Sequence, residues 1–569
     1  MHPSEVIKDI KYNDLKGMNA VFVNMPIRES AAPNTTPQGP LLLATNLRDN
    51  YGVNASVIDL NGYRIRDGIS EQRGLPNGRH LSERETYRLF EKHFKTYGAP
   101  DLVGLSGIIT TLGWQEKTAK MIQDISPDTF LVSGGGLATE LREGLFNYIP
   151  ELNGVASAEG DDVIVKIAYD AITVREKGWE RAISGGNLSP YYFGKFGGLP
   201  RLVYGGAGPL NLDAVPFADL TLIERDVNGV PILENYIDVA VWGDKKTGNS
   251  SAAPFTVDRS TTFVSSRGCP HPCDFCYKGM QGGSSYDVRS AENVAEEFIL
   301  HKEKYGVDFI GMPDDNFAVK RKRIEELVPL LKPLNVKWGT HMRLDEAADI
   351  KNVSGDGQIT FENPRRVDMM AEAGCVYVGF GAESASPRVL ESMKKGGFIL
   401  KNGLEEINVD GKNYSFPRSM IYGIKNSEEV GIHANCTWIM GYPGERLEDL
   451  KQSIAFIKWQ EDFYNSVGKP SSSVNKGLFT ATAYPGTGMF SRPEVMSKLS
   501  ENFGINFDAE GKPICNENFR QYILGLEDAT KVLVDKNGNP LNYSEMDDET
   551  FLKARGHINN GDLEKVLAM

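Results

Sequence analysis

The sequence predicts an α/β protein with a Rossmann-like, doubly wound parallel sheet followed by a partial (β/α)6 barrel. Three observations lead to this fold class. The chain has 569 residues, which is too long for one ordinary core. Short apolar runs alternate with helical patterns over residues 18–185 and again over residues 259–485. Between them, residues 186–258 lose this rhythm and are rich in Gly, Pro and Tyr, so we expect a linker there.

The first alternation contains five short, apolar, strand-like runs. They are residues 20–23, 55–58, 102–105, 130–132 and 154–156. Helical spacing predicts helices at 41–51, 83–97, 114–125 and 140–148. Ligands of doubly wound sheets bind beyond the carboxyl ends of the strands. The turns after the last three strands are therefore candidate binding segments, although a nucleotide-binding or cofactor-free domain would show similar turns.

The second alternation contains six strand-like runs with helical segments between them. The runs are residues 261–265, 307–311, 335–341, 376–380, 434–440 and 477–483. Six β/α repeats are two short of a closed eight-stranded barrel, which predicts an open, partial barrel. Residues 395–426 fit no repeat, and their Gly, Asn and Asp content indicates an inserted loop or small hairpin. Residues 486–569 form the expected small C-terminal region, with a turn at 537–540 and a helix around 549–555.

The net charge and the hydropathy of the sequence limit which kinds of binding partner are expected. The formal net charge of −14 disfavours nonspecific attraction to nucleic acid phosphates. No run of about eighteen apolar residues is present, so no membrane association is expected. The N-terminus lacks the pattern of a secretory signal, which predicts a cytoplasmic protein. The basic run 320–323 opens an amphipathic segment, and we interpret it as a solvated helix end.

Three of the six cysteines are clustered after the first barrel strand, at the end where barrel active sites form. They are Cys269, Cys273 and Cys276. Thiolates are the ligands of iron-sulfur clusters, and three of them leave one iron of a 4Fe-4S cluster without a protein ligand. The alternative is a zinc site, which normally has four protein ligands. His271 could be the fourth, but it lies between two prolines, where the backbone is stiff.

The loop from Arg267 to Tyr277, including the aromatic Phe275 before the last cysteine, resembles the signature of the radical S-adenosylmethionine (radical SAM) superfamily. The resemblance implies that S-adenosylmethionine binds the open iron and is cleaved reductively to methionine and a 5'-deoxyadenosyl radical. It also implies an external electron donor of the flavodoxin or ferredoxin type. The residues that match S-adenosylmethionine contacts of the family are Phe275, Tyr277, Asp314, Arg343, Glu383, Gly441 and Pro443.

Some of these matches have simpler explanations when each is taken alone. Asp314 could cap the following helix, Arg343 could pair with a nearby carboxylate, and Pro443 could only form a turn. Their order on successive predicted strands favours the cofactor assignment. Glu383 could accept hydrogen bonds from the ribose or amino group, and Gly441 would let the adenine approach the backbone.

The N-terminal domain resembles the cobalamin-binding domain that precedes the barrel in one large radical SAM class. The matching residues are Ser106, Gly107, Thr110, Gly134, Gly135, Gly136, Glu159 and Gly160. Two departures are present. The first strand is not followed by an Asp-x-His-x-x-Gly motif, so no histidine ligand below the cobalt is expected. The usual Gly-Glu-Gly-Glu turn is reduced to Ala-Glu-Gly-Asp at 158–161.

Together, the two resemblances predict a cobalamin-dependent radical SAM methyltransferase that acts on an unactivated carbon, or a phosphinate phosphorus, of a small-molecule or peptide substrate. No cysteine precedes Cys269, which disfavours a methylthiotransferase, because those enzymes place a second cysteine cluster in the front domain. Two alternatives stay open. One is a cobalamin-dependent radical oxidation or cyclisation of the anaerobic cyclase type, and the other is a noncatalytic metal- or corrinoid-binding protein. No motif identifies the substrate or a proton-transferring side chain.

Overall fold

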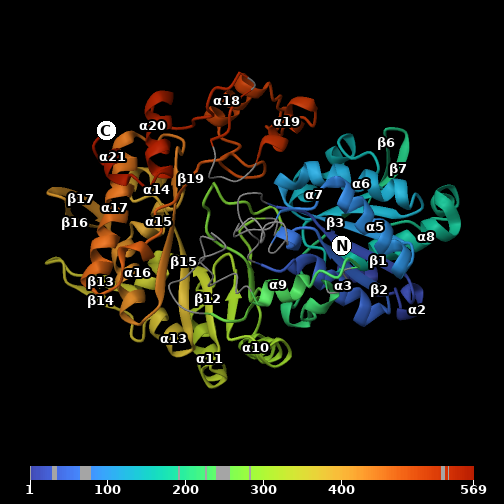
Figure 1. Ribbon diagram of the computed structural model, residues 1–569, viewed down its shortest axis with the longest axis horizontal. Helices are drawn as coiled ribbons and strands as arrows, with labels where there is room; N and C mark the ends of the chain where they lie inside the picture. The colour runs from blue at the N-terminus through green and yellow to red at the C-terminus, as the bar shows by residue number, and fades with distance from the viewer. Residues whose placement is uncertain are drawn as a thin grey trace.

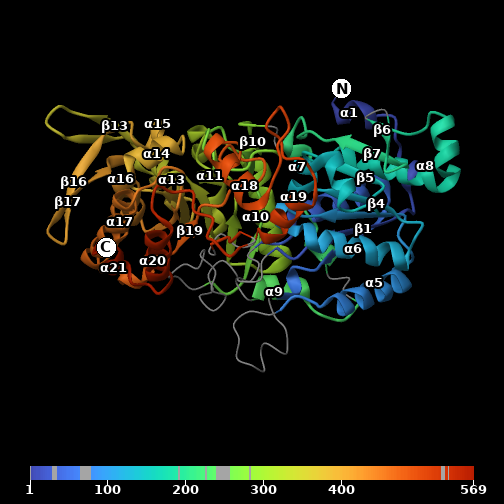
Figure 2. The ribbon, with the colours of Figure 1, turned by 90° about the horizontal axis from the view of Figure 1, so that it is seen from above.

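The computed structural model describes residues 2–27, 35–64, 79–189, 192–223, 227–238, 257–280, 283–526, 532–535 and 537–569. Two α/β units lie side by side, and the C-terminal helices α18 (Pro493–Phe503) and α19 (Glu517–Gly525) lie over the space between them (Figure 1). Figure 2 shows the same arrangement from above. The two predicted parallel sheets are confirmed, each in its own unit.

The front sheet has the strand order β2-β1-β3-β4-β5, in which all neighbours are parallel. The strands are β1 (Asn19–Asn24), β2 (Asn54–Asp59), β3 (Leu102–Ser106), β4 (Phe130–Gly134) and β5 (Gly154–Ser157). They coincide with the five predicted runs. The covering helices are α3 (Gln38–Tyr51), α5 (Glu83–Tyr97), α6 (Leu112–Ile125) and α8 (Val163–Ser184). The strand order reverses between β1 and β3, and a doubly wound sheet binds ligands at such a point.

Two features of this unit differ from the sequence expectation. The predicted helix at 140–148 is divided into α7 (Gly136–Leu141) and a 3-10 segment (Arg142–Asn147). In addition, β6 (Phe193–Phe196) and β7 (Leu199–Gly205) extend the sheet inside the predicted linker. Gly197 and Gly198 both have positive φ, as a tight hairpin with a two-residue loop requires. Residues 239–256 of that linker lie outside the described ranges.

The second sheet has six parallel strands in the order β19-β18-β15-β12-β11-β8, which confirms the open, partial barrel. The strands are β8 (Ser260–Thr262), β11 (Phe309–Met312), β12 (Lys337–Met342), β15 (Cys375–Glu383), β18 (His433–Met440) and β19 (Leu478–Thr480). The helices outside it include α10 (Ala291–Tyr305), α11 (Arg321–Leu331), α13 (Arg366–Glu372), α14 (Pro387–Ser392) and α17 (Leu447–Ser466). Their apolar faces pack on the sheet, so the core lies between the two layers.

The segment 395–426 contains the expected hairpin, formed by β16 (Leu404–Val409) and β17 (Lys412–Pro417). It also contains α15 (Gly396–Ile399) and the start of α16 (Arg418–Glu429), the last helix before β18. One expectation about this unit is wrong in part. Arg323, in the basic run at the start of α11, is buried and donates to the Ser265 carbonyl at 2.9 Å, so this run is not wholly solvated.

The C-terminal region connects both units. Helix α19 packs against α6, where Arg520 donates to both carboxylate oxygens of Glu116 at 2.6 and 2.7 Å. The predicted terminal helix lies within α20 (Asp548–Asn559), which is followed by α21 (Leu563–Leu567).

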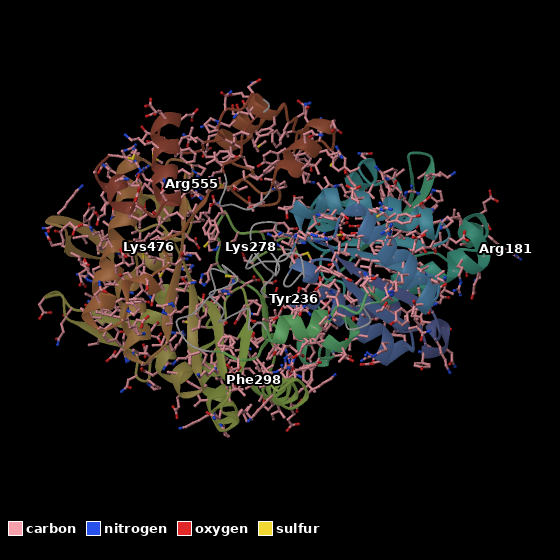
Figure 3. The ribbon with its side chains drawn as sticks, viewed as in Figure 1. Arg181, Tyr236, Lys278, Phe298, Lys476 and Arg555 are labelled. Carbon is pink, nitrogen blue, oxygen red and sulfur yellow. The ribbon has the colours of Figure 1, made fainter. Side chains whose placement is uncertain are left out.

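A second connection between the two units is made by Tyr236 of α9 (Ile232–Asp238), which is labelled in Figure 3. Its hydroxyl donates to Asp59 at the end of β2 at 2.9 Å. None of the described helices combines the length and apolar character that crossing a membrane requires.

Candidate active site

The cysteine loop starts from a short antiparallel ladder. Strand β9 (Ser266–Gly268) pairs with β10 (Tyr286–Val288), so the three cysteines lie on the connection between two hydrogen-bonded strands. Cys273 is buried, Cys269 is half-buried and Cys276 is exposed. The loop follows β8 at the carboxyl end of the barrel strands. This is the end at which barrel active sites are built.

The surroundings of Cys273 favour its thiolate. A hydrogen bond with Cys276, together with the nearby cations Lys395 and Arg343, lowers the pKa of the Cys273 thiol to about 5. The same hydrogen bond raises the pKa of Cys276, so the shared proton stays on Cys276. The thiolate is the form of cysteine that binds metal.

A cluster and a single metal ion place different demands on these side chains. Within the described ranges, no three His, Cys, Asp or Glu side chains converge closely enough to hold one ion. A 4Fe-4S cluster needs no such convergence, because each thiolate binds a separate iron. The chemistry and placement of the three cysteines therefore fit a cluster with three protein ligands.

Arg343 follows β12 and begins α12 (Leu344–Ala348) beside this loop. Its guanidinium lies 4.9 Å from the ring centroid of Phe398, and its Nε donates to Asp345 at 2.9 Å. The pairing with a neighbouring carboxylate, the simpler explanation of this arginine, is thus present. However, Nη2 is buried and has no hydrogen-bond partner among the residues that the structure describes. A buried guanidinium donor needs an acceptor, so a ligand carboxylate fits this position.

Glu383 ends β15 at a shift in strand register and has a φ of 64°, in the left-handed region. It is 8% exposed, and burial raises the pKa of its carboxyl. Its ion-pair partner is the buried Lys395, at 3.4 Å. Lys395 also lies 5.8 Å from the ring centroid of Phe275 in the cysteine loop. Lys395 lies at the start of the segment 395–426, which fits no β/α repeat, so no local pattern indicated this role.

The structure shows structural roles for Asp314 and Gly441 that the sequence did not indicate. Asp314 is buried and accepts hydrogen bonds from the backbone and hydroxyl of Ser265 and from the hydroxyl of Ser266, at 2.7, 2.5 and 2.7 Å. These bonds make Asp314 a support for the start of the cysteine loop, and its contact with S-adenosylmethionine stays a prediction. A Cβ on Gly441 would lie 2.7 Å from the Phe551 ring of α20, so this glycine is needed for close packing, and its contact with adenine stays a prediction.

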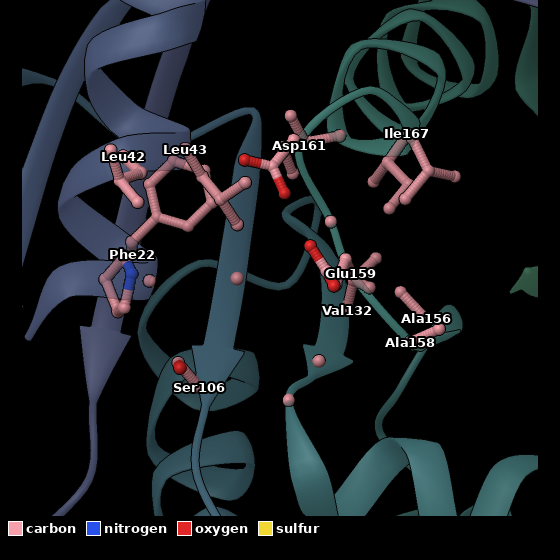
Figure 4. Close-up of a pocket in the computed structure, with 18 of the residues that line it drawn as sticks. Phe22, Leu42, Leu43, Ser106, Val132, Ala156, Ala158, Glu159, Asp161 and Ile167 are labelled. Atoms are coloured by element: carbon pink, nitrogen blue, oxygen red, sulfur yellow. The ribbon is translucent and has the colours of Figure 1, made fainter. Parts of the chain in front are cut away.

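A narrow apolar slot of about 280 Å³ opens at the carboxyl end of the front sheet. Figure 4 shows Leu42 and Leu43 of α3 and Ile167 of α8 around it, with the carboxylates of Glu159 and Asp161 on its wall. Five of the eight residues assigned to cobalamin line this slot. They are Ser106, Gly134, Gly135, Glu159 and Gly160.

A larger cavity of about 760 Å³ is shared by the two units. The other three assigned residues, Gly107, Thr110 and Gly136, line one wall, and Phe275 and Tyr277 of the cysteine loop line another. The hydroxyl of Thr110 is buried without a partner, which suits a polar ligand group. Tyr277 reaches across the domain boundary and donates to the Gly136 carbonyl at 3.3 Å.

A charged contact also joins the two units at this place. Arg267, which lies in β9, forms ion pairs with Glu159 and Asp161 from the turn after β5. Glu159 was expected to contact cobalamin, and its carboxylate is instead bound to the arginine that leads into the cysteine loop. The turn of one domain thus holds the loop of the other.

The model of the radical SAM superfamily matches residues 263–457, which include all three clustered cysteines and four of the six barrel strands, β11, β12, β15 and β18. Residues 263–457 of this chain therefore form a radical SAM domain. The match spans the middle of the partial barrel, from the end of β8 into α17, and the similarity indicates an enzyme. Within the match, the loop that carries the three cysteines lies between the barrel and the front sheet, beside the shared cavity.

Similarity to other proteins extends beyond the radical SAM domain. An uncharacterized methyltransferase of Pyrococcus horikoshii is 28% identical over 485 residues, which are 83% of this chain and 82% of that protein. An anaerobic magnesium-protoporphyrin IX monomethyl ester cyclase of Cereibacter sphaeroides is 23% identical over 64% of this chain and half of its own length.

Two solved structures share the fold over most of this chain. The radical S-adenosylmethionine methyltransferase TsrM of Kitasatospora setae, solved with cobalamin and a [4Fe-4S] cluster, has a TM-score of 0.56 and 16% identity, covering 97% of this chain and 89% of its own. The cobalamin-dependent enzyme OxsB, solved with aqua-cobalamin and S-adenosylmethionine, has a TM-score of 0.55 and 16% identity, covering 88% of this chain and 64% of its own. At this identity, the likeness shows the fold.

Proposed function

We propose that this radical SAM enzyme is a cobalamin-dependent methyltransferase that acts on an unactivated carbon or on phosphorus. The observation that carries the proposal is the shared 760 Å³ cavity. Phe275 and Tyr277 of the cysteine loop and Gly107 and Thr110 of the front sheet line the same space. A substrate in this cavity would be within reach of both cofactor sites. Radical methyl transfer requires this arrangement, because hydrogen removal and methyl delivery occur at one atom.

The cofactors carry the difficult chemistry and the protein orients them. When bound, a 4Fe-4S cluster with S-adenosylmethionine supplies an organic radical, and cobalamin supplies a transferable methyl group. Cys269, Cys273 and Cys276 would hold the cluster and leave one iron open. The free Nη2 of Arg343 would bind the carboxylate of S-adenosylmethionine, and Glu383 would accept hydrogen bonds from its amino or ribose groups.

The front domain would hold cobalamin at the carboxyl end of its sheet. The apolar slot between α3 and α8 suits the nucleotide tail, and the unpartnered Thr110 hydroxyl suits a polar group of the corrin. No histidine is among the described residues that line the slot or the larger cavity. We therefore propose binding without a protein ligand below the cobalt.

The size of the larger cavity suits a small molecule or a peptide side chain. Its lining is mostly apolar, so it would also exclude water from a radical intermediate. We propose that a flavodoxin- or ferredoxin-type protein supplies the electron and that the enzyme works in the cytoplasm, where an oxygen-sensitive cluster is best protected. The six cysteines are all free in the structure.

Anaerobic reconstitution tests the proposal. The purified chain would be loaded with iron, sulfide and hydroxocobalamin, reduced with dithionite and given S-adenosylmethionine. We expect brown cluster absorbance, retained cobalamin and formation of 5'-deoxyadenosine. Cys269→Ala should remove the cluster absorbance, whereas Cys515→Ala, outside the loop, should not. An unchanged spectrum of Cys269→Ala would refute the ligand assignment, and an intact cluster with no cleavage of S-adenosylmethionine would refute the radical reaction.

The products distinguish the two radical outcomes once a substrate is present. Methyl transfer yields 5'-deoxyadenosine together with S-adenosylhomocysteine, because a second S-adenosylmethionine remethylates the cobalamin. A reaction of the cyclase type yields 5'-deoxyadenosine alone. The similarity to the Cereibacter cyclase over 64% of this chain makes this second outcome the alternative to test.

A further inference from the structure

Asp274 lies between two of the clustered cysteines, Cys273 and Cys276, and is only 5% exposed. Both oxygens of its carboxylate accept hydrogen bonds from residues far away in the sequence. Arg492 donates to Oδ2 from Nε and Nη2, at 2.8 and 2.6 Å, and the Tyr442 hydroxyl donates to Oδ1. Burial and the bond to Asp274 raise the pKa of Tyr442, so this hydroxyl stays protonated and remains a donor. The acidic residue inside the cysteine loop is thus bound from two sides.

The backbone of the same residue is held as well. The Asp274 N–H donates to the Met393 carbonyl at 3.2 Å, and the Met489 N–H donates to the Asp274 carbonyl at 2.7 Å. Arg492 also donates to the hydroxyl of Ser392 at 3.1 Å and to its carbonyl. We call residues 487–492 the C-terminal strap. It fastens the cysteine loop to the end of α14.

The strap approaches the loop as closely as two backbones allow. A Cβ on Gly488 would lie 2.8 Å from Asp274 Cβ and 3.2 Å from its carbonyl oxygen, so no larger residue fits without a shift. The side chains of Arg492 and Asp274 are 18% and 3% exposed, so water and salt screen this ion pair only weakly. The strap therefore fixes the position of the cysteine loop and places a cation next to the buried carboxylate of that loop.

We propose that Arg492 is a positioning residue for the iron-sulfur cluster and that it acts through Asp274. It fixes the Cys273–Cys276 segment and balances the negative charge of a buried carboxylate next to two cluster ligands. Without the guanidinium, that carboxylate would oppose addition of an electron to the cluster, because a like charge in a poorly screened site disfavours the reduced form. The inference rests on the proposed function, since it requires a cluster in this loop.

The experiment compares cluster reduction potentials in reconstituted full-length protein, measured by a redox titration followed by electron paramagnetic resonance. Arg492→Gln should shift the potential to a more negative value than that of the wild type. Arg492→Lys keeps the charge and should give a smaller shift. Asp274→Asn combined with Arg492→Gln removes the unbalanced charge and should restore the potential toward the wild-type value. Arg388→Gln, which breaks an ion pair of α14 with Asp449, is the matched control and should leave the potential unchanged.

A second variant covers the case in which Arg492→Gln does not fold. Gly488→Ala pushes the strap away from Asp274 without changing any charge, and it should shift the potential in the same direction. A wild-type potential in both Arg492→Gln and Gly488→Ala would overturn the inference. So would a shift in Arg492→Gln that the Asp274→Asn change fails to reverse, because the effect would then not depend on charge. Failure of the wild-type chain to hold a cluster would instead refute the proposed function.

Discussion

Arg267 donates two hydrogen bonds to Asp161, at 2.8 and 3.0 Å, across the boundary between the barrel and the front domain. The arginine lies directly before the glycine that precedes Cys269, and the aspartate lies in the turn after β5. The segments that we assign to the cluster and to cobalamin are therefore joined by one side-chain contact. A displacement of one segment would be transmitted to the other through this pair.

The first prediction concerns the contribution to protein stability of the contact that Arg267 makes with Glu159 and Asp161. Arg267→Gln leaves the carboxylates of Glu159 and Asp161 buried without their cation, and breaking a buried ion pair costs about 3–5 kcal/mol. We expect a clear fall in the urea midpoint of the apoprotein. Arg79→Gln, which removes an exposed pair with Glu85, should cost less than about 1 kcal/mol.

Restoring the charge balance of this contact checks whether unpaired charge causes the loss of stability. Adding Glu159→Gln and Asp161→Asn to Arg267→Gln replaces the unpaired carboxylates with neutral amides. The urea midpoint should then rise again toward the wild-type value. No recovery in the triple variant would mean that lost packing, and not unpaired charge, causes the instability.

The second prediction concerns S-adenosylmethionine. Arg343→Gln removes the unpartnered Nη2 donor, and a charge-assisted hydrogen bond is worth about 1.5–3 kcal/mol. The dissociation constant of S-adenosylmethionine, measured by calorimetry on the cluster-loaded enzyme, should rise roughly tenfold to a hundredfold. Arg365→Gln is a suitable control, because this arginine pairs with Asp368 and Glu429 at the start of α13. Equal affinities in all three proteins would exclude Arg343 from the cofactor site.

The third prediction concerns the apolar slot. Leu43→Trp fills part of its 280 Å³, and overpacking costs about 1–3 kcal/mol. The affinity for hydroxocobalamin should fall by about tenfold. The measurement is the absorbance of the hydroxocobalamin that stays with the protein through gel filtration. Asn50→Trp adds the same side chain to an exposed position of the same helix and should bind normally. Normal binding by Leu43→Trp would place cobalamin outside the slot.

The fourth prediction is a pH dependence of stability that arises from Glu445. Burial raises the pKa of this carboxyl from 4.5 to about 8, and its Oε1 has no partner. The folded protein therefore keeps the proton up to about pH 8, whereas the unfolded chain releases it near pH 4.5. The unfolded state binds fewer protons between these values, so this contribution to stability is full below pH 4.5 and is lost as the pH rises to about 8.

The size of this effect is roughly 5 kcal/mol at most, and a matched pair of variants isolates it. Urea midpoints of the wild type should fall between pH 5 and pH 8. Glu445→Gln cannot ionise, so its midpoints should fall less over the same range. Glu448→Gln, at an exposed position in the first turn of α17, should retain the wild-type slope. Identical slopes in all three proteins would show that Glu445 is ionised in the folded state at neutral pH.

The parts of the fold that repeat locally could be predicted from the sequence. The five front strands and six barrel strands each have a short apolar run, and the three cysteines have a spacing that carries its own chemical meaning. The hairpin of β6 and β7 was missed, although Gly197 and Gly198 marked its turn. Its sequence lacks strong alternation, and the strands are stabilised by the free edge of β5, which no local pattern shows.

The site was predicted less completely, because its supporting contacts join distant segments. Arg492 and Asp274 are 218 residues apart, and nothing near either one indicates the other. Lys395 belongs to a segment without a repeat pattern, and only the fold brings it to Glu383. Gly441 is predicted to contact adenine because a glycine allows close approach. The Phe551 ring also approaches this glycine, from a helix whose position depends on tertiary packing.

The C-terminal strap has a consequence for the order of events during biosynthesis. A ribosome releases residue 274 long before it has made residue 492, and so the cysteine loop emerges while its arginine partner does not yet exist. The β19 strand that closes the sheet also comes late, at 478–480. Until then, Asp274 lacks the contacts that hold it between the two cysteines. The full set of contacts that hold the cysteine loop therefore exists only after translation has passed the strap, and a ribosome-bound fragment ending before it would present an incompletely supported loop.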